Sequence, residues 1–263
     1  MAENSAIEWT QHTWNCWQGC HKVSEGCANC YMYRDKKRYG QDPTKVVRSA
    51  KNTFNMPLRL KDPAHVFVCS WSDFFIADAD DWRAEAWEII RKTPHLTYQL
   101  LTKRPENIAD RLPADWGSGY SNVWLGVTAE NQEMLDKRWS YLRDIPARVR
   151  FVSVEPMLGP VDLQRPLEGW DVEAAHDPCC DGNCYNCPVP LQVETPRLDW
   201  VICGCESGPN RRPAEIDWIR GLKGQCVSAN VPFFLKQAEI NGQLVKMPEL
   251  DGKVWAQFPE VQP

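Results

Sequence analysis

Short apolar runs alternate with helix-like segments along most of this chain, and no other feature restricts its fold as strongly. The runs have the length of strands and are almost continuously apolar: HVFVCS (65–70), TYQLLT (97–102), NVWLGVT (122–128), VRFVSVEP (149–156), DWVICGCES (199–207) and PFFLKQ (232–237). Strands without a polar face are typical of a parallel sheet that is covered on both sides. Because helical periodicity follows several of these runs, the pattern predicts an α/β fold.

Three segments between the runs have helical periodicity: 78–93, 130–145 and 214–230. In the first, one apolar stripe is formed by Trp82, Ala86, Ile89 and Ile90. With a further strand before the first cysteine, the chain has about seven strand–helix units, which predicts a complete or partial (β/α) TIM-type barrel with parallel strands. A doubly wound open sheet fits the same pattern and remains the alternative.

The length of 263 residues suits one large domain, and we treat 1–263 as a single barrel domain. Two segments break the strand–helix rhythm. Residues 14–31 form a polar segment with four cysteines, which we call the cluster loop. Residues 164–198 are rich in Pro, Gly and Cys and have little periodicity, so we expect a Cys-rich insertion between two strands.

The N-terminal residues MAENSAIEWTQ have neither a basic start nor an apolar run, so we expect no secretory signal. The longest apolar runs are far too short to span a membrane. Both observations predict a cytoplasmic protein, in a reducing compartment where structural disulfides are rare. The twelve cysteines therefore favour metal binding over disulfide bridges.

The cluster loop reads WNCWQGCHKVSEGCANCY and contains Cys16, Cys20, Cys27 and Cys30. The C-x2-C spacing of the last two cysteines lets both sulfurs reach one metal. Four cysteine ligands would close a tetrahedral zinc site. Three would leave a 4Fe–4S cluster with one iron open to a small molecule. The spacing alone leaves zinc and the iron–sulfur cluster as alternatives.

A second group of cysteines lies in CCDGNCYNC, within the predicted insertion: Cys179, Cys180, Cys184 and Cys187. The last three have the C-x3-C-x2-C spacing of the usual radical S-adenosylmethionine cluster motif. Their position late in the chain is wrong for that role, because the motif normally follows the first strand of the barrel. We expect a structural zinc site or an auxiliary iron–sulfur cluster here.

Each predicted strand ends on polar residues, and these are candidate site residues: Ser70, Ser72 and Asp73; Thr102, Lys103 and Arg104; Thr128, Glu130 and Asn131; Glu155; Glu206 and Ser207; Lys236 and Gln237. In a parallel barrel the carboxyl ends of all strands converge on one rim, where active sites are built. The pattern therefore favours an enzyme. It does not indicate which reaction.

The formal net charge of −5 argues against a protein that coats nucleic acid through its overall charge. Residues 31–51 are locally basic and include Arg34, Lys36, Lys37, Arg38, Lys45, Arg48 and Lys51. One interpretation is a solvated helix face. The other is a phosphate-binding surface beside the cluster loop, where the aromatic residues Trp14, Trp17, Tyr31 and Tyr33 would stack on bases.

The cluster loop, VFVCSWSDFF, LLTKRPEN, NVWLGVTAEN, VRFVSVEPMLGPVDL, DWVICGCESGPNRRP and PFFLKQ together resemble the phage-encoded three-cysteine-motif family. These are phage and bacterial proteins of unassigned function that are similar to radical S-adenosylmethionine enzymes. The resemblance implies a radical-SAM-like barrel with a 4Fe–4S cluster on Cys20, Cys27 and Cys30. The family usually has another residue in place of Cys16, and a fourth thiolate ligand there would close the cluster.

The resemblance implies an enzyme that uses the cluster and S-adenosylmethionine to generate a 5′-deoxyadenosyl radical and to modify a nucleic acid or nucleotide. A reductant protein would supply the electron, in the cytosol of a bacterium or of a phage-infected host. For cofactor binding we expect Ser72, Asp73, Glu206 and Ser207. For catalysis we expect Lys103, Glu155 and Lys236, the two lysines being suited to a carboxylate or phosphate.

Two other functions are compatible with the same cysteines. One is a zinc-stabilised nucleic-acid-binding or interaction protein without catalysis, which would use Cys16 as a ligand. The other is an iron–sulfur redox or repair protein that does not use S-adenosylmethionine.

Overall fold

The computed structural model describes residues 5–173 and 191–260. Its centre is an eight-stranded sheet with the order β1-β4-β5-β6-β7-β10-β11-β12. The strands of this sheet are β1 His12–Trp14, β4 Ala64–Val68, β5 Leu96–Thr102, β6 Val123–Thr128, β7 Val149–Val154, β10 Trp200–Gly204, β11 Phe233–Ile240 and β12 Gln243–Lys246. All neighbours are parallel except β12, which pairs antiparallel with β11.

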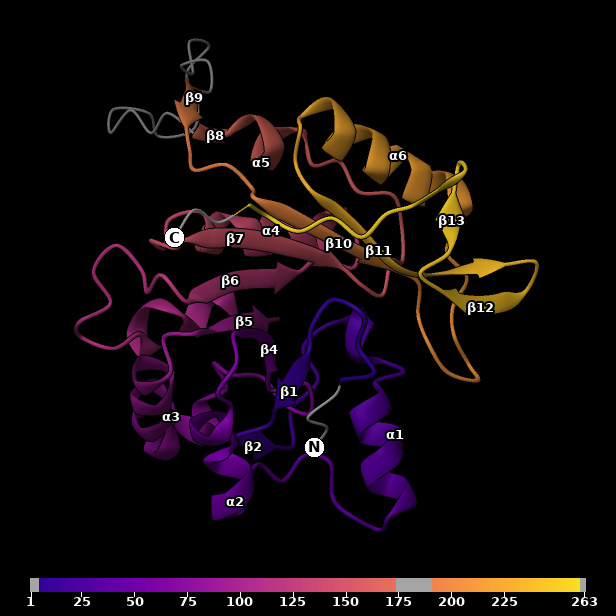
Figure 1. The fold of residues 1–263 in the computed structure, drawn as a ribbon. Coiled ribbons are helices and arrows are strands. Elements are labelled where there is room, and N and C mark those ends of the chain that lie inside the picture. Colours follow the sequence, from indigo (N-terminus) through magenta and orange to yellow (C-terminus); the bar gives the residue numbers. More distant parts are fainter. Residues whose placement is uncertain (1–4, 174–190, 261–263) are drawn as a thin grey trace, which may run out of the picture.

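The sheet is a curled half-barrel (Figure 1). Its parallel strands follow one another in chain order, so the order does not reverse as it does in a doubly wound sheet, and that alternative is wrong. Within the described residues β1 and β12 remain the two edges. The partial barrel, rather than a complete TIM barrel, is therefore the form that the structure has.

The predicted helices are present as α3 (Asp80–Lys92), α4 (Gln132–Leu142) and α6 (Ile216–Ser228). Shorter helices are α1 (Tyr31–Arg38), α2 (Lys51–Phe54) and α5 (Gln164–Glu168). In α3, Trp82 is only half-buried, while Arg83 and Trp87 are buried with the rest of the predicted stripe. Arg83 can be buried because its guanidinium donates to the carbonyl oxygens of Phe74 and Ile76.

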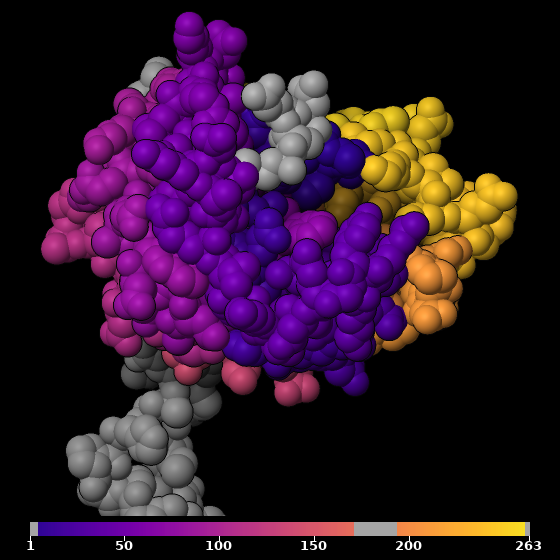
Figure 2. Space-filling model, turned by 90° about the horizontal axis from the view of Figure 1, so that it is seen from below, coloured from indigo at the N-terminus to yellow at the C-terminus, as the bar shows by residue number. Residues whose placement is uncertain are grey.

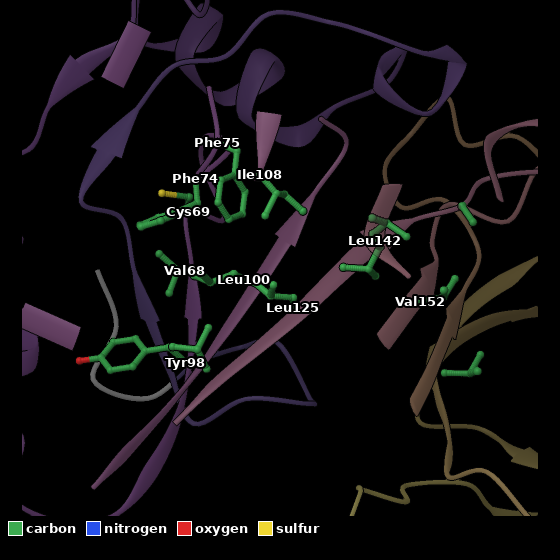
Figure 3. Close-up of a cluster of buried hydrophobic side chains, with 14 of the residues drawn as sticks. Val68, Cys69, Phe74, Phe75, Tyr98, Leu100, Ile108, Leu125, Leu142 and Val152 are labelled. Atoms are coloured by element: carbon green, nitrogen blue, oxygen red, sulfur yellow. The ribbon is translucent and has the colours of Figure 1, made fainter. Parts of the chain in front are cut away.

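The sheet has two faces with different partners. On the helix-covered face, Leu100, Leu125 and Val152 join the main hydrophobic core together with Leu142 of α4 (Figure 3). The same core contains side chains of α3 and α6. On the other face, which we call the inner face, a second cluster contains the aromatic residues Trp9, Phe67, Trp124, Phe151, Trp200 and Phe234. Since successive side chains of a strand alternate between faces, both faces of these strands are apolar, as the sequence predicted.

The inner face changes character along the strands. Its aromatic layer lies toward the amino ends, and Phe151 covers Gly126 so closely that a methyl group there would overlap the ring. Toward the carboxyl ends, the same face continues with small and polar residues, namely Gly126, Thr128, Ser153, Glu155, Gly204 and Lys236. The half-barrel is therefore filled at one end and polar at the other.

Two predicted features lie partly or wholly outside the described residues. Of the expected insertion 164–198, the structure describes α5 and the antiparallel pair β8 (Trp170–Glu173) and β9 (Leu191–Glu194). The four cysteines predicted to bind zinc or an auxiliary cluster (Cys179, Cys180, Cys184 and Cys187) lie in 174–190, outside the described residues. Among the described residues there is no helix with the length and apolar character needed to cross a membrane.

Two further strand pairs complete the structure. Strand β2 (Trp17–Gln18) pairs antiparallel with β3 (Val47–Arg48), and β13 (Glu249–Leu250) pairs with β14 (Lys253–Val254). The β2–β3 pair joins the cluster loop to the end of the basic segment 31–51. The basic segment is thereby held beside the cysteines.

Candidate functional site

The cluster loop crosses the carboxyl edge of the sheet, where the polar strand ends lie. It follows β1 directly and leads into α1 (Figure 1). At the end of β4, Tyr31 donates a hydrogen bond to the Ser70 carbonyl oxygen, and Ser72 donates one to the Gly19 carbonyl oxygen. Ser72 was predicted to bind a cofactor. In the structure its hydroxyl group instead donates to the carbonyl oxygen of Gly19 in the cluster loop.

Asp73 anchors the first attachment of the loop. Its buried carboxylate accepts hydrogen bonds from the backbone NH of Phe75 and Lys103, from the Thr102 hydroxyl at 2.7 Å, and from Arg104 Nη1 at 3.2 Å. Because four donors surround this carboxylate, its hydrogen-bonding capacity is used within the protein. The structure thus places the predicted cofactor residue Asp73 beneath the loop, as a support for Arg104.

Arg104 connects that support to the first cysteine of the set. Its Nη2 donates to the His21 carbonyl oxygen at 2.6 Å, and its Nη1 lies 3.5 Å from Cys20 Sγ. Burial raises the pKa of the Cys20 thiol to about 11, against the lowering effect of the Arg104 charge. Metal coordination requires the thiolate, so the nearby guanidinium favours the form that binds metal.

Glu130, at the end of β6, makes the second attachment. It is fully buried, forms an ion pair with Arg138 of α4, and accepts a hydrogen bond from Ser24. Burial opposes its ionisation, but Lys103 and Arg138 hold the pKa of Glu130 below its usual value. Gly26 lies so close to this carboxylate that a methyl group would overlap it, which explains a glycine before Cys27.

Glu206, after β10, makes the third attachment. It accepts hydrogen bonds from Asn29 Nδ2 at 2.8 Å and from Arg212 Nε and Nη2 at 3.0 and 2.6 Å. Arg212 Nη2 also donates to the Glu25 carbonyl oxygen at 3.0 Å. In Figure 2 the indigo-to-violet N-terminal surface borders the orange residues of this segment. The predicted cofactor residue Glu206 thus contacts the loop itself.

Cys20, Cys27 and Cys30, the three cysteines of the expected cluster, all lie close enough to Tyr33 for their charges to act on its hydroxyl group. Partial burial raises the pKa of Tyr33, and the charges of Cys20, Cys30 and Cys27 act in the same direction. Each of the three thiols is only half-buried. Among the described residues, no three or more His, Cys, Asp or Glu side chains stand together as a ready metal site. Within the described residues, the three thiols thus share one neighbourhood and do not form a ligand set.

Cys16 faces away from this group. It is fully buried in the main hydrophobic core, and its Sγ lies 3.4 Å from Sγ of Cys69, which follows β4. Burial raises the pKa of Cys69 well above its usual value, so this thiol stays protonated. The four cysteines of the loop are therefore divided into three beside the strand ends and one in the core.

The predicted catalytic residues lie at the polar end of the inner face. Glu155 forms an ion pair with Lys236 of β11, which is two strands away in the sheet order. Lys103 Nζ donates to Thr128 Oγ1 at 3.2 Å and lies close enough to Glu130 to lower its pKa. All three side chains are half-buried. A ligand could therefore reach them.

Other predicted residues have simpler surroundings. Ser207 is half-buried beside Glu206. Cys203, Cys205 and Cys226 are buried free thiols. The prediction that Trp14 and Trp17 stack on bases is wrong, because both are fully buried and donate to the carbonyl oxygens of Phe54 and Asp73.

Sequence reasoning missed the partners that hold the loop, above all Arg138, Arg212, Ser24 and Asn29. Arg138 is eight residues after Glu130, but Glu130 lies before the start of α4, so the helical spacing of neighbouring side chains does not predict this pair. Arg212 follows Glu206 within the same loop. The sequence did not indicate which carboxylates Asn29 and Ser24 would contact, because these partners are 177 and 106 residues away in the chain.

Fold and site define an α/β protein with a half-barrel sheet and a three-cysteine loop over its carboxyl edge. The chain belongs to the family described as "Protein of unknown function (DUF5131)", whose model matches residues 4–259. Neither the curated proteins nor the solved structures gave a match.

Proposed function

We propose that this protein is a radical S-adenosylmethionine enzyme with a 4Fe–4S cluster on Cys20, Cys27 and Cys30. The observation that carries the proposal is the division of the cysteines. Three half-buried thiols lie on a loop across the carboxyl edge of a half-barrel, and the fourth, on Cys16, lies in the core against Cys69. A set of three protein ligands leaves one iron of such a cluster open.

The donor set fits an iron–sulfur cluster in its chemistry. Thiolates are the soft ligands that bind such clusters. Arg104 beside Cys20 would offset part of the negative charge of the thiolates. When bound and reduced, cluster and S-adenosylmethionine supply a one-electron cleavage of a carbon–sulfur bond that yields a 5′-deoxyadenosyl radical. The protein's contribution is then to bind, orient and exclude water.

The inner face offers groups suited to these tasks. Lys103 and Lys236 can bind a carboxylate or phosphate, and Glu155 can bind an ammonium group. Ser207 can donate to a hydroxyl or carboxylate group nearby. The aromatic layer beneath closes the half-barrel on its amino-terminal side, which limits access of water from there.

A nucleic acid or nucleotide is the substrate class that we propose. Exposed basic residues lie within the cluster loop and in the segment after it, in a chain of net negative charge: Lys22, Arg34, Lys37, Arg38, Lys45 and Lys51. Lys22 Nζ lies 5.0 Å from the centre of the Tyr33 ring. Proteins that bind single-stranded nucleic acid typically contact the phosphates with lysines and arginines and stack aromatic side chains on the bases.

The test is anaerobic purification followed by reaction with dithionite and S-adenosylmethionine. We expect a brown protein that absorbs at about 400 nm and contains about four irons per chain. After the reaction it should have released 5′-deoxyadenosine. The Cys20→Ser, Cys27→Ser and Cys30→Ser variants should lose iron and activity together. A colourless wild-type protein that contains zinc would reject the proposal in favour of a zinc-stabilised binding protein. An iron-loaded protein that never cleaves S-adenosylmethionine would favour a redox function.

A further inference from the structure

The turn that carries Cys27 is fixed to the sheet edge on both sides. Ser24, before it, is bound to Glu130. Asn29, after it, donates from Nδ2 to Glu206 Oε2 at 2.8 Å and to the Asn210 carbonyl oxygen at 2.9 Å. Since Cys27 and Cys30 belong to this stretch, whatever holds Ser24 and Asn29 also determines where the two sulfurs lie.

Glu206 already accepts four hydrogen bonds from groups of the protein. Its Oε2 accepts from Asn29 Nδ2, from the Arg212 backbone NH at 2.8 Å and from Arg212 Nε at 3.0 Å. Its Oε1 accepts from Arg212 Nη2 at 2.6 Å. A paired contact of this kind uses the fork of the guanidinium and fixes its plane.

Arg212 extends the contact to the start of the turn. Besides Glu206, its Nη2 donates to the carbonyl oxygen of Glu25, two residues before Cys27. Burial opposes ionisation of Glu206, but the hydrogen bonds from Arg212 lower its pKa below the usual value. The pair is therefore charged at neutral pH. Arg212 holds the Glu25 side of the turn and Glu206 the Asn29 side, so together they link both sides to the segment that follows β10.

We propose that Glu206 and Arg212 are positioning residues that hold the Cys27–Cys30 turn in place for cluster assembly. This inference rests on the proposed cluster at Cys20, Cys27 and Cys30. It changes the expected role of Glu206, from contact with a cofactor to control of the loop that carries the ligands. Arg212 acquires a role that sequence did not suggest.

The neighbouring arginine provides a matched control. Arg211 Nε donates to Glu239 Oε2 at 2.6 Å, and its Nη2 donates to the Gly242 carbonyl oxygen at 2.7 Å. Both partners belong to the β11–β12 hairpin region. Arg211→Ala therefore removes an ion pair of the same chemistry from the same loop without touching the contacts of the turn.

The first experiment measures amide hydrogen exchange of the peptide 24–30 in the full chain. Loss of the paired hydrogen bonds should speed this exchange by about tenfold in Arg212→Ala and Glu206→Gln. Wild type and Arg211→Ala should exchange at the same slow rate. Arg212→Lys should be intermediate, because an ammonium group cannot form the paired contact. Equal rates in Arg212→Ala and Arg211→Ala would overturn the inference.

The second experiment measures iron retained after anaerobic reconstitution, together with the electron paramagnetic resonance spectrum of the reduced protein. Arg212→Ala should retain less iron than Arg211→Ala and show a changed spectrum. Full retention and an unchanged spectrum in Arg212→Ala would overturn the positioning role. A wild-type protein that takes up no iron would instead refute the proposed function, while the exchange rates still decide whether the pair holds the turn.

Discussion

At the scale of single residues, the structure gives the same residue type quite different roles. Cys16 and Cys20 are four positions apart, yet Cys16 is fully buried and Cys20 lies beside Arg104 at the sheet edge. Both follow β1 and they lie on opposite sides of β2, so the direction of each side chain depends on the local path of the chain and not on spacing. If the proposed cluster forms, Cys16 is therefore too deeply buried to be counted among its ligands.

This division can be tested by replacing cysteines one at a time. Cys16→Ala should keep the iron content of wild type and lower the free energy of unfolding by about 1 kcal/mol, because one buried sulfur is lost from the core. Cys27→Ala should lose iron and leave the apoprotein folded. The measurements are iron analysis and denaturant unfolding. Loss of iron in Cys16→Ala would mean that Cys16 is a ligand.

The buried pair of Glu130 and Arg138 gives a second prediction at this scale. Glu130→Ala should lower the free energy of unfolding by about 3–5 kcal/mol, because it leaves the Arg138 charge buried without its partner. The double variant Glu130→Met and Arg138→Met should recover much of that loss, since it leaves no buried charge. Urea unfolding of the three proteins measures both values. A double variant no more stable than Glu130→Ala would contradict this account.

At the scale of elements, the cluster loop depends on the strand ends and has little structure of its own. Its regular parts are β2 and a single turn of 3-10 helix at Glu25–Cys27. Three carboxylates at the ends of β4, β6 and β10 hold it through Arg104, Ser24 and Arg212. A loop with so few internal bonds is ordered chiefly by these attachments.

The acidic members of these attachments predict how stability depends on pH. The pKa of Glu206 is lowered in the folded protein, so the unfolded chain binds more protons as the pH falls. Stability is therefore full above the unfolded pKa, about 4.3, and declines as the pH falls through the lower folded value. Denaturant unfolding between pH 3 and 6, as an approximate range, tests this. Glu206→Gln should decline less steeply, and an equal slope would contradict the prediction.

At the scale of the whole molecule, charge is distributed unevenly. The chain carries a formal charge of −5, while the exposed surface of α1 and the following segment is basic and borders the cluster loop. In a chain of net negative charge, such a locally basic surface would attract a polyanion more strongly than the acidic parts of the surface do. The half-barrel places the same face at its polar end.

This distribution predicts salt-dependent binding of a single-stranded oligonucleotide. The triple variant Lys37→Ala, Arg38→Ala and Lys45→Ala should bind more weakly, and its log–log salt slope should be shallower by about 2, since three phosphate contacts are removed. A control triple variant at Lys92, Lys137 and Lys253, which are exposed on other elements, should bind as wild type does. Fluorescence anisotropy at several salt concentrations is the measurement. Equal weakening in both variants would reject a localised surface.

The sequence by itself determined the parallel α/β sheet, because the strands β4 to β7, β10 and β11 have apolar residues on both faces and segments with helical periodicity lie between several of them. It also determined that polar residues end the strands, and parallel pairing then brings those ends together. Only the tertiary structure decided the partners of Asp73, Glu130 and Glu206, since each depends on contacts between segments far apart in the chain. The tertiary structure likewise decided that Cys16 and Trp17 lie in the core and not at the surface of the cluster loop. Their spacing in the sequence does not specify which side chains the core will cover.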